Sequence, residues 1–89
     1  MWFVYIVRCA DRSLYTGVTT DATRRVAEHN EGRGARYTRS RGPVSLVYVE
    51  SAEDRGAALR REHEIKRMTA QGKKRLVAAK RRRARTRGF

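Results

Sequence analysis

The chain has 89 residues, which suffices for one small domain and excludes a large hydrophobic core. Its 22 Lys and Arg residues against 9 Asp and Glu residues give a formal charge of +13, which favours nucleic acid as the partner over a merely solvated basic surface. The single cysteine, Cys9, excludes an intrachain disulfide and a Cys/His metal site, and no stretch is apolar enough for a membrane span, so we expect a cytoplasmic protein.

The first part of the chain predicts a β-hairpin followed by a helix. The near-continuous apolar run at 2–9 is typical of a strand covered on both faces, and hence of a central strand. Residues 10–13 predict a turn, and residues 14–19 predict a second strand. We expect Thr20 or Asp21 to cap a helix that ends near residue 31.

The second part of the chain adds one strand and two helices. Residues 31–43 predict a polar loop, and residues 44–50 predict a third strand. We expect Ser51 to cap a helix that runs to about Arg67, and Thr69 to cap a last helix over about 70–82. These elements predict an α/β domain of the α+β kind over residues 1–82. It has a small three-stranded antiparallel sheet flanked by helices, in the order ββαβα plus a C-terminal helix, followed by a frayed basic tail at 83–89.

The positive charge is concentrated toward the end of the chain. Residues 1–72 carry 13 basic and 9 acidic side chains, whereas residues 73–89 carry 9 basic and no acidic ones. Such cations bind backbone phosphates irrespective of base sequence, and this binding weakens steeply with salt. The candidate nucleic-acid-binding residues lie in the polar loop and in this last segment: Arg33, Arg36, Arg39, Arg41, Lys73, Lys74, Arg75, Lys80 and Arg81.

The length of the hairpin loop decides whether Tyr5 and Tyr15 share one face of the sheet. A three-residue loop at 10–12 pairs Tyr5 with Gly17 and makes the two tyrosines diagonal neighbours, roughly 7–8 Å apart at Cα. Gly17 would then leave room above the backbone for a ligand, and Arg12 would adopt the left-handed conformation that glycine tolerates better. A two-residue loop would separate the tyrosines, and strand tyrosines also serve simply as packing residues.

Helical periodicity directs three polar side chains toward the interior. Arg25 and His29 are one turn apart on the first helix and lie beside its inner stripe. Glu62 lies within the apolar stripe of the second long helix. A lone carboxylate on an inward face requires a partner, which is either an arginine in an ion pair or a bound cation. For His29 the simpler alternative is packing of a short surface helix against the sheet.

This set of residues resembles the GIY-YIG nuclease superfamily. The matching features are FVY at 3–5, YTG at 15–17, Arg25 eight residues after Gly17, His29 one turn later, and the glutamate of ALRRE at 58–62. The chain is most similar to the small stand-alone UPF0213 group, because GARYTR at 34–39 is similar to a loop of that group. Two features depart from the family pattern: Phe3 and Val4 replace the glycine and isoleucine of the first motif, and no separate DNA-binding domain is visible.

The resemblance implies a metal-dependent endonuclease that hydrolyses phosphodiester bonds in DNA. Its cleavage would be structure-directed or non-specific, and its role would lie in DNA repair or recombination. It implies one divalent ion, Mg²⁺ or Mn²⁺, held by Glu62. Tyr5 would act as general base or position the water, and Tyr15 would orient Tyr5 or a phosphate oxygen. Arg25 would bind the non-bridging oxygens, and His29 would bind the phosphate or relay a proton.

Two other functions stay open at this point. A nucleic-acid-binding module that retains the fold without turnover would explain the basic tail. A basic ribosome- or RNA-associated protein would also explain the tail, but it leaves the inward Glu62 unexplained. The residues do not exclude RNA as the substrate, nor a protein partner.

Overall fold

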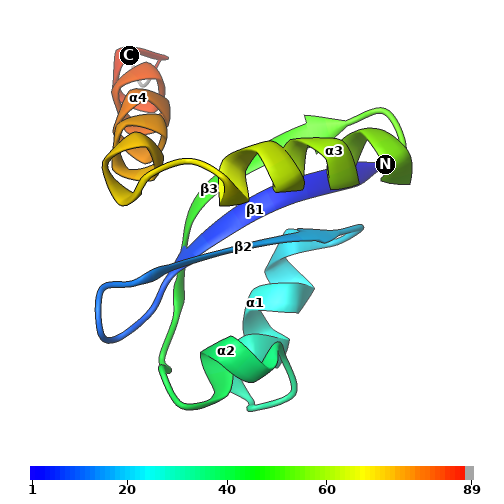
Figure 1. Ribbon diagram of the computed structural model, residues 1–89, viewed down its shortest axis with the longest axis vertical. Coiled ribbons are helices and arrows are strands. Elements are labelled where there is room, and N and C mark those ends of the chain that lie inside the picture. The colour runs from blue at the N-terminus through cyan, green and yellow to red at the C-terminus, as the bar shows by residue number, and fades with distance from the viewer. Residues whose placement is uncertain (88–89) are drawn as a thin grey trace.

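The computed structural model describes the backbone of residues 1–87 and the side chains of residues 1–80. The elements are β1 (Trp2–Arg8), β2 (Leu14–Thr19), α1 (Ala22–Asn30), α2 (Arg36–Arg39), β3 (Ser45–Ala52), α3 (Arg55–Lys66) and α4 (Ala70–Arg87). The strands form one antiparallel sheet in the order β2-β1-β3, which confirms β1 as the central strand (Figure 1). Within the described part, no helix is long and apolar enough to cross a membrane.

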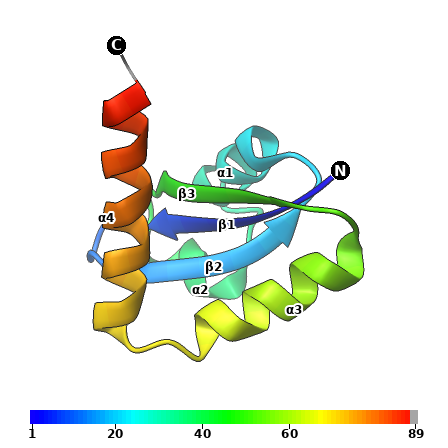
Figure 2. The ribbon, with the colours of Figure 1, turned by 90° about the horizontal axis from the view of Figure 1, so that it is seen from above.

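Helices cover both faces of the sheet, with α1 and α2 on one side and α3 and α4 on the other (Figures 1 and 2). Alternate residues of β1 serve the two faces, as the pleat of a strand requires. Val4 and Ile6 pack against Ile65 of α3 and Val77 of α4. The odd-numbered residues, led by Tyr5, pack on the side of α1. The predicted α+β architecture is therefore confirmed, and the two faces of β1 have different neighbours.

The three-residue hairpin loop is present as predicted. The Cys9 amide donates to the Ser13 carbonyl at 2.9 Å, and the register pairs Tyr5 with Gly17. Arg12 has a φ of 71°, which is the left-handed conformation expected for the last loop position. Tyr5 and Tyr15 therefore point to the same face of the sheet.

The boundaries of α3 and β3 differ from the predicted ones. Ser51 does not cap α3, because the strand pairing of β3 with β1 continues to Ala52. The cap is Asp54, whose side chain accepts a hydrogen bond from the Ala57 amide. At the start of α1 the cap is Asp21, one of the two predicted candidates.

The loop and the C-terminal segment also hold more helix than predicted. The polar loop contains the short helix α2, and α4 continues to Arg87 instead of ending near residue 82. Between residues 73 and 87 the sequence is rich in Ala, Lys and Arg and has no Gly or Pro, which favours continuous helix. The expected fraying is therefore wrong for residues 83–87, and residues 88–89 lie outside the described part of the chain.

Candidate active site

A chain of three hydrogen bonds connects the centre of the sheet to helix α2. The Tyr5 hydroxyl lies 2.9 Å from His29 Nε2, and His29 Nδ1 lies 2.7 Å from the Thr38 hydroxyl. That hydroxyl donates its one hydrogen to the Ala35 carbonyl at 2.9 Å, so it accepts from His29. The imidazole proton is therefore on Nδ1, and Nε2 accepts the Tyr5 proton.

Burial holds both members of the Tyr5–His29 pair in their neutral forms. Tyr5 is 1% exposed and His29 is 2% exposed. Burial raises the pKa of Tyr5, whereas the nearby Arg25 guanidinium opposes this shift. Burial, together with the charge of Arg25, lowers the pKa of His29 below its usual value. A neutral phenol therefore donates to a neutral imidazole near pH 7.

The buried state of His29 makes the stability of the fold depend on pH. Because the pKa of His29 is lower in the folded than in the unfolded chain, protonation favours unfolding. We expect full stability above about pH 6.5, the unfolded value, and a falling melting temperature as the pH decreases below it. In a His63→Gln variant His29 is the remaining imidazole of the chain, and its NMR titration should have a midpoint below about 6.5. A midpoint at or above that value would contradict the prediction.

Arg25 connects the buried pair to the solvent. Its guanidinium bonds Glu28 Oε1 at 3.0 Å, and its side chain is 30% exposed. The Glu28 carboxylate, followed by Tyr5, raises the pKa of Arg25 and keeps it charged. A partly exposed guanidinium beside a phenol is well placed to receive a phosphate oxygen.

Aromatic rings extend the site from Tyr5 to the surface. The ring centroids of Tyr5 and Tyr15 lie 6.5 Å apart, and Tyr15 stacks on Tyr37 of α2 at 5.8 Å. The guanidinium of Arg41 lies 4.0 Å above the Tyr37 ring. The outer end of this stack, Tyr37, is exposed, so a ligand at the surface has access to it.

Two glycines allow Tyr5 and His29 to lie where they do. The space above Gly17, expected to admit a ligand, is filled by the phenol of Tyr5; a Cβ on Gly17 would lie 2.6 Å from the Tyr5 hydroxyl oxygen. That expectation is therefore wrong. A Cβ on Gly34 would lie 2.1 Å from His29 Nδ1 and 2.8 Å from the His29 Cα, so this position also excludes a larger residue.

We expect Gly17→Ala to break the hydrogen bond between Tyr5 and His29 while the fold is retained. The added methyl would push the Tyr5 hydroxyl away from His29, at a cost of about 1–3 kcal/mol in the free energy of unfolding. NMR spectra of the His29 ring and thermal melts of the same samples measure both effects. Gly72→Ala is the matched control, because its Cβ would have no contact closer than 3.4 Å. Identical His29 spectra in the two variants would contradict the prediction.

Glu62 reaches this site from α3, which lies along the β2 edge of the sheet (Figure 2). Its carboxylate is 18% exposed and pairs with Lys66 Nζ at 3.4 Å. The Lys66 ammonium lies 5.9 Å from the centroid of Tyr15. Burial is the main cause of the raised pKa of Tyr5, and the negative charge of Glu62 adds to this shift. The ion-pair partner of Glu62 is therefore a lysine of its own helix and not an arginine, which was one of the two partners that the sequence left open.

The residues around Glu62 fit a metal ion that has few protein ligands. In residues 1–80 no three His, Cys, Asp or Glu side chains gather into a metal-binding cluster. Mg²⁺ often binds through one or two carboxylates and keeps several waters, so the single Glu62 carboxylate is compatible with it. Lys66 is half-exposed and can move away from Glu62.

The predicted nucleic-acid-binding residues form two separate groups. The loop group lies on the side of α1 and α2, where Arg36 and Arg39 are exposed, Arg33 pairs with Glu31, and Arg41 pairs with Asp11 at 3.2 Å. The second group lies on α4, across the sheet: Lys73, Lys74, Arg75 and Lys80. The side chain of Arg81 lies outside the described residues.

Five residues of the site were not predicted from the sequence. Glu28 and Lys66 follow Arg25 and Glu62 by one helical turn, a spacing that could have identified both as partners. Gly34, Tyr37 and Thr38 lie within GARYTR at 34–39, where only the two arginines were predicted to take part in binding.

The chain is similar to known proteins in sequence and in fold. The sequence model of the GIY-YIG catalytic domain matches residues 1–75. A UPF0213 protein of Haloquadratum walsbyi is 61% identical over 75 residues, which is 84% of each chain, and one of Desulfotalea psychrophila is 57% identical over 79 residues, 88% of this chain and 72% of that protein. The solution structure of a UPF0213 protein from Bacillus halodurans is 44% identical, covers 90% of this chain and 86% of its own, and superposes with a TM-score of 0.59.

Proposed function

This chain belongs to the GIY-YIG family, and from that premise we propose that it is a metal-dependent endonuclease that hydrolyses phosphodiester bonds in DNA. The observation that carries the proposal is the hydrogen-bonded chain from Tyr5 through His29 to Thr38. Tyr48 is also a buried phenol with a fixed acceptor, but Tyr5 differs from it by lying next to the partly exposed guanidinium of Arg25, which can hold a phosphate beside the phenol. The resemblance further suggests branched or damaged DNA of repair and recombination as the substrate.

The Tyr5–His29 pair supports a proton relay for hydrolysis. A water attacking phosphorus gives its proton to the Tyr5 oxygen while the Tyr5 proton passes to His29 Nε2. The hydrogen bond from His29 Nδ1 to Thr38 keeps the ring oriented during this transfer. Because the pKa of Tyr5 is raised, a free phenolate is scarce near neutral pH, and the basic His29 nitrogen compensates for this.

Arg25, Tyr15 and Glu62 complete the proposed machinery. The Arg25 guanidinium binds the non-bridging oxygens and stabilises the charge that develops on them. Tyr15 packs beside Tyr5 and orients it or a phosphate oxygen. Glu62, released from Lys66, would hold one Mg²⁺ or Mn²⁺, which supplies positive charge to the phosphate and the leaving oxygen.

The surface around this site supports binding that is independent of base sequence. The exposed Arg36 and Arg39 lie on α2 beside the Tyr37–Tyr15 stack, where they can contact backbone phosphates. Such contacts select the shape and charge of the nucleic acid, so we propose structure-directed or non-specific cleavage. RNA and a non-catalytic binding role are the alternatives that the experiment must distinguish.

The proposal is tested with labelled branched, flapped, single-stranded and duplex DNA and an RNA duplex, in Mg²⁺, Mn²⁺ or EDTA. We expect metal-dependent cleavage that falls by roughly 10²-fold or more in Glu62→Gln, while binding persists. Glu64→Gln, on the same helix but exposed, is the matched control. Binding by all proteins without cleavage of any substrate would favour the non-catalytic module.

A further inference from the structure

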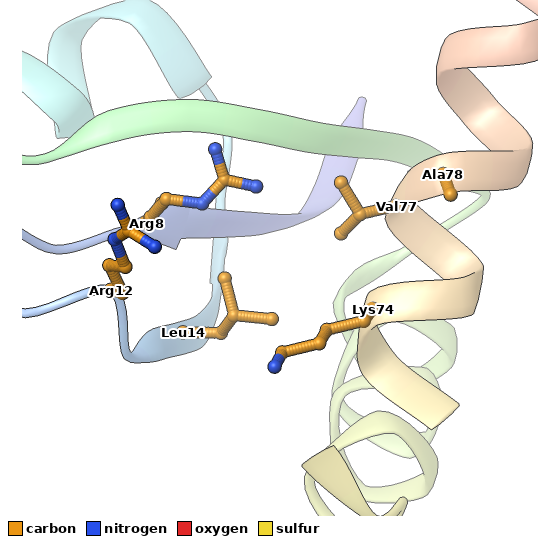
Figure 3. A pocket seen from close by; sticks show the side chains of 6 residues that line it. All are labelled: Arg8, Arg12, Leu14, Lys74, Val77 and Ala78. Carbon is orange, nitrogen blue, oxygen red and sulfur yellow. The ribbon is translucent and has the colours of Figure 1, made fainter. Parts of the chain in front are cut away.

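A cavity of about 420 Å³ lies between the β-hairpin and α4 (Figure 3). Leu14 and Val77, which line it, pack on the face of the sheet opposite Tyr5. Arg8 and Arg12 line it from the hairpin, and Lys74 lines it from α4. Its apolar wall is formed by Leu14 and Val77. A second cavity of about 360 Å³ adjoins it and adds Lys73.

The cations of this cavity are not neutralised by the protein. Within residues 1–80, no carboxylate forms an ion pair with Arg8, Arg12 or Lys74. The carboxylate that lines the adjoining cavity, Asp11, is held by Arg41 at 3.2 Å and by the amide and hydroxyl of Ser13. The positive charge of the cavity is therefore free to attract an anion.

The backbone at Arg12 provides an independent indication of function. Its φ of 71° is strained for an arginine and would suit glycine. None of the described residues forms a hydrogen bond with the Arg12 side chain. A bond within the protein therefore does not explain why an arginine stands at this position. The Arg12 guanidinium thus lines the cavity although its residue has an unfavourable backbone conformation.

We propose that this cavity binds a nucleotide, with its phosphate between Arg8, Arg12 and Lys74 and its sugar or base against Leu14 and Val77. The volume lies in the range of small-molecule sites, and the pairing of three cations with an apolar wall matches the two ends of a nucleotide. The nucleotide is either free or one unit of a single strand. Because the cavity lies across the sheet from Tyr5, this site does not depend on the proposed cleavage.

The proposal is tested by the binding of thymidine 5′-monophosphate, inorganic phosphate, and a labelled single strand of about 10 nucleotides, all in EDTA so that no cleavage occurs. The critical variant is Arg12→Gly, which relieves the strained φ and should melt at the same or a higher temperature than the parent. Arg60→Gln is the matched control, because this exposed arginine of α3 lines neither cavity.

We expect Arg12→Gly to weaken strand binding roughly five- to tenfold at low salt and to reduce the salt slope by about 0.7, the value of one phosphate contact on a single strand. NMR methyl resonances of Leu14 and Val77 should shift on titration. Shifts with the free nucleotide support a nucleotide site, and shifts with the strand alone support a strand site. Equal affinity and slope for Arg12→Gly and Arg60→Gln would overturn the proposal, as would methyl shifts that inorganic phosphate alone reproduces.

Discussion

Tyr5→Phe should reduce the cleavage rate by roughly 10²- to 10⁴-fold, the range that general base catalysis contributes. The substitution retains the ring that packs above Gly17, so the shape of the site is preserved. It removes the proton donor to His29 Nε2, which is also the oxygen that we propose receives the proton of the attacking water. Binding of DNA should change little, because the hydroxyl is buried and the substitution leaves Arg25 and the exposed Arg36 and Arg39 unchanged.

The control for Tyr5→Phe is Tyr48→Phe. Tyr48 is also buried, and its hydroxyl donates to Glu50 on β3, away from His29. Each variant leaves one acceptor without its donor, so each should lower the free energy of unfolding by about 1–3 kcal/mol. Thermal melts and single-turnover cleavage separate the two effects. Cleavage by Tyr5→Phe within a few-fold of Tyr48→Phe would exclude the proton relay.

The sequence was sufficient to predict the face of the sheet on which Tyr5 and Tyr15, the candidate site residues of the hairpin, lie. Loop length determines register, and register determines which side chains share a face, so three loop residues place Tyr5 and Tyr15 together and Arg12 at a positive φ. Those relations are local, and a short stretch of sequence contains all of them.

The contacts that depend on packing between elements could not be predicted. Nothing local indicates that the ring of Tyr5 fills the space above Gly17, or that Thr38 crosses from α2 to fix the tautomer of His29. The cap of α3 was misplaced for a similar reason, because pairing with β1 extends β3 through Ser51. Local capping preference is weaker than the hydrogen bonds of a continuing ladder.

Helical periodicity identified Glu62 as unusual but did not identify its environment. The wheel places it among apolar residues, whereas in the structure its carboxylate is 18% exposed and pairs with Lys66, whose ammonium lies 5.9 Å from the centroid of Tyr15. A position between core and solvent suits the metal-holding role proposed for Glu62, since such a carboxylate must be shielded yet accessible. The helical wheel does not distinguish this arrangement from a buried ion pair.

Arg25→Gln should reduce cleavage by roughly 10²- to 10³-fold, as expected when one charged group that stabilises the transition state is removed. It should also move the pH dependence, because the charge of Arg25 lowers the pKa of both His29 and Tyr5. Without that charge His29 becomes protonated at higher pH, and a protonated His29 no longer accepts the Tyr5 proton. The acidic limb of the pH–rate profile should therefore shift to higher pH in the variant.

Arg24→Gln is the matched control, because it removes the same charge from the neighbouring, outward-facing position of α1. It should leave both the rate and the profile near those of the parent protein. Arg25→Lys keeps the positive charge but loses the planar guanidinium that donates two parallel hydrogen bonds. It should therefore restore the position of the pH–rate profile and recover only part of the cleavage rate. A reduced rate with an unshifted profile would mean that Arg25 binds phosphate without acting on the Tyr5–His29 pair. A shifted pH–rate profile with the rate of the parent protein would mean that Arg25 acts on the Tyr5–His29 pair without binding phosphate.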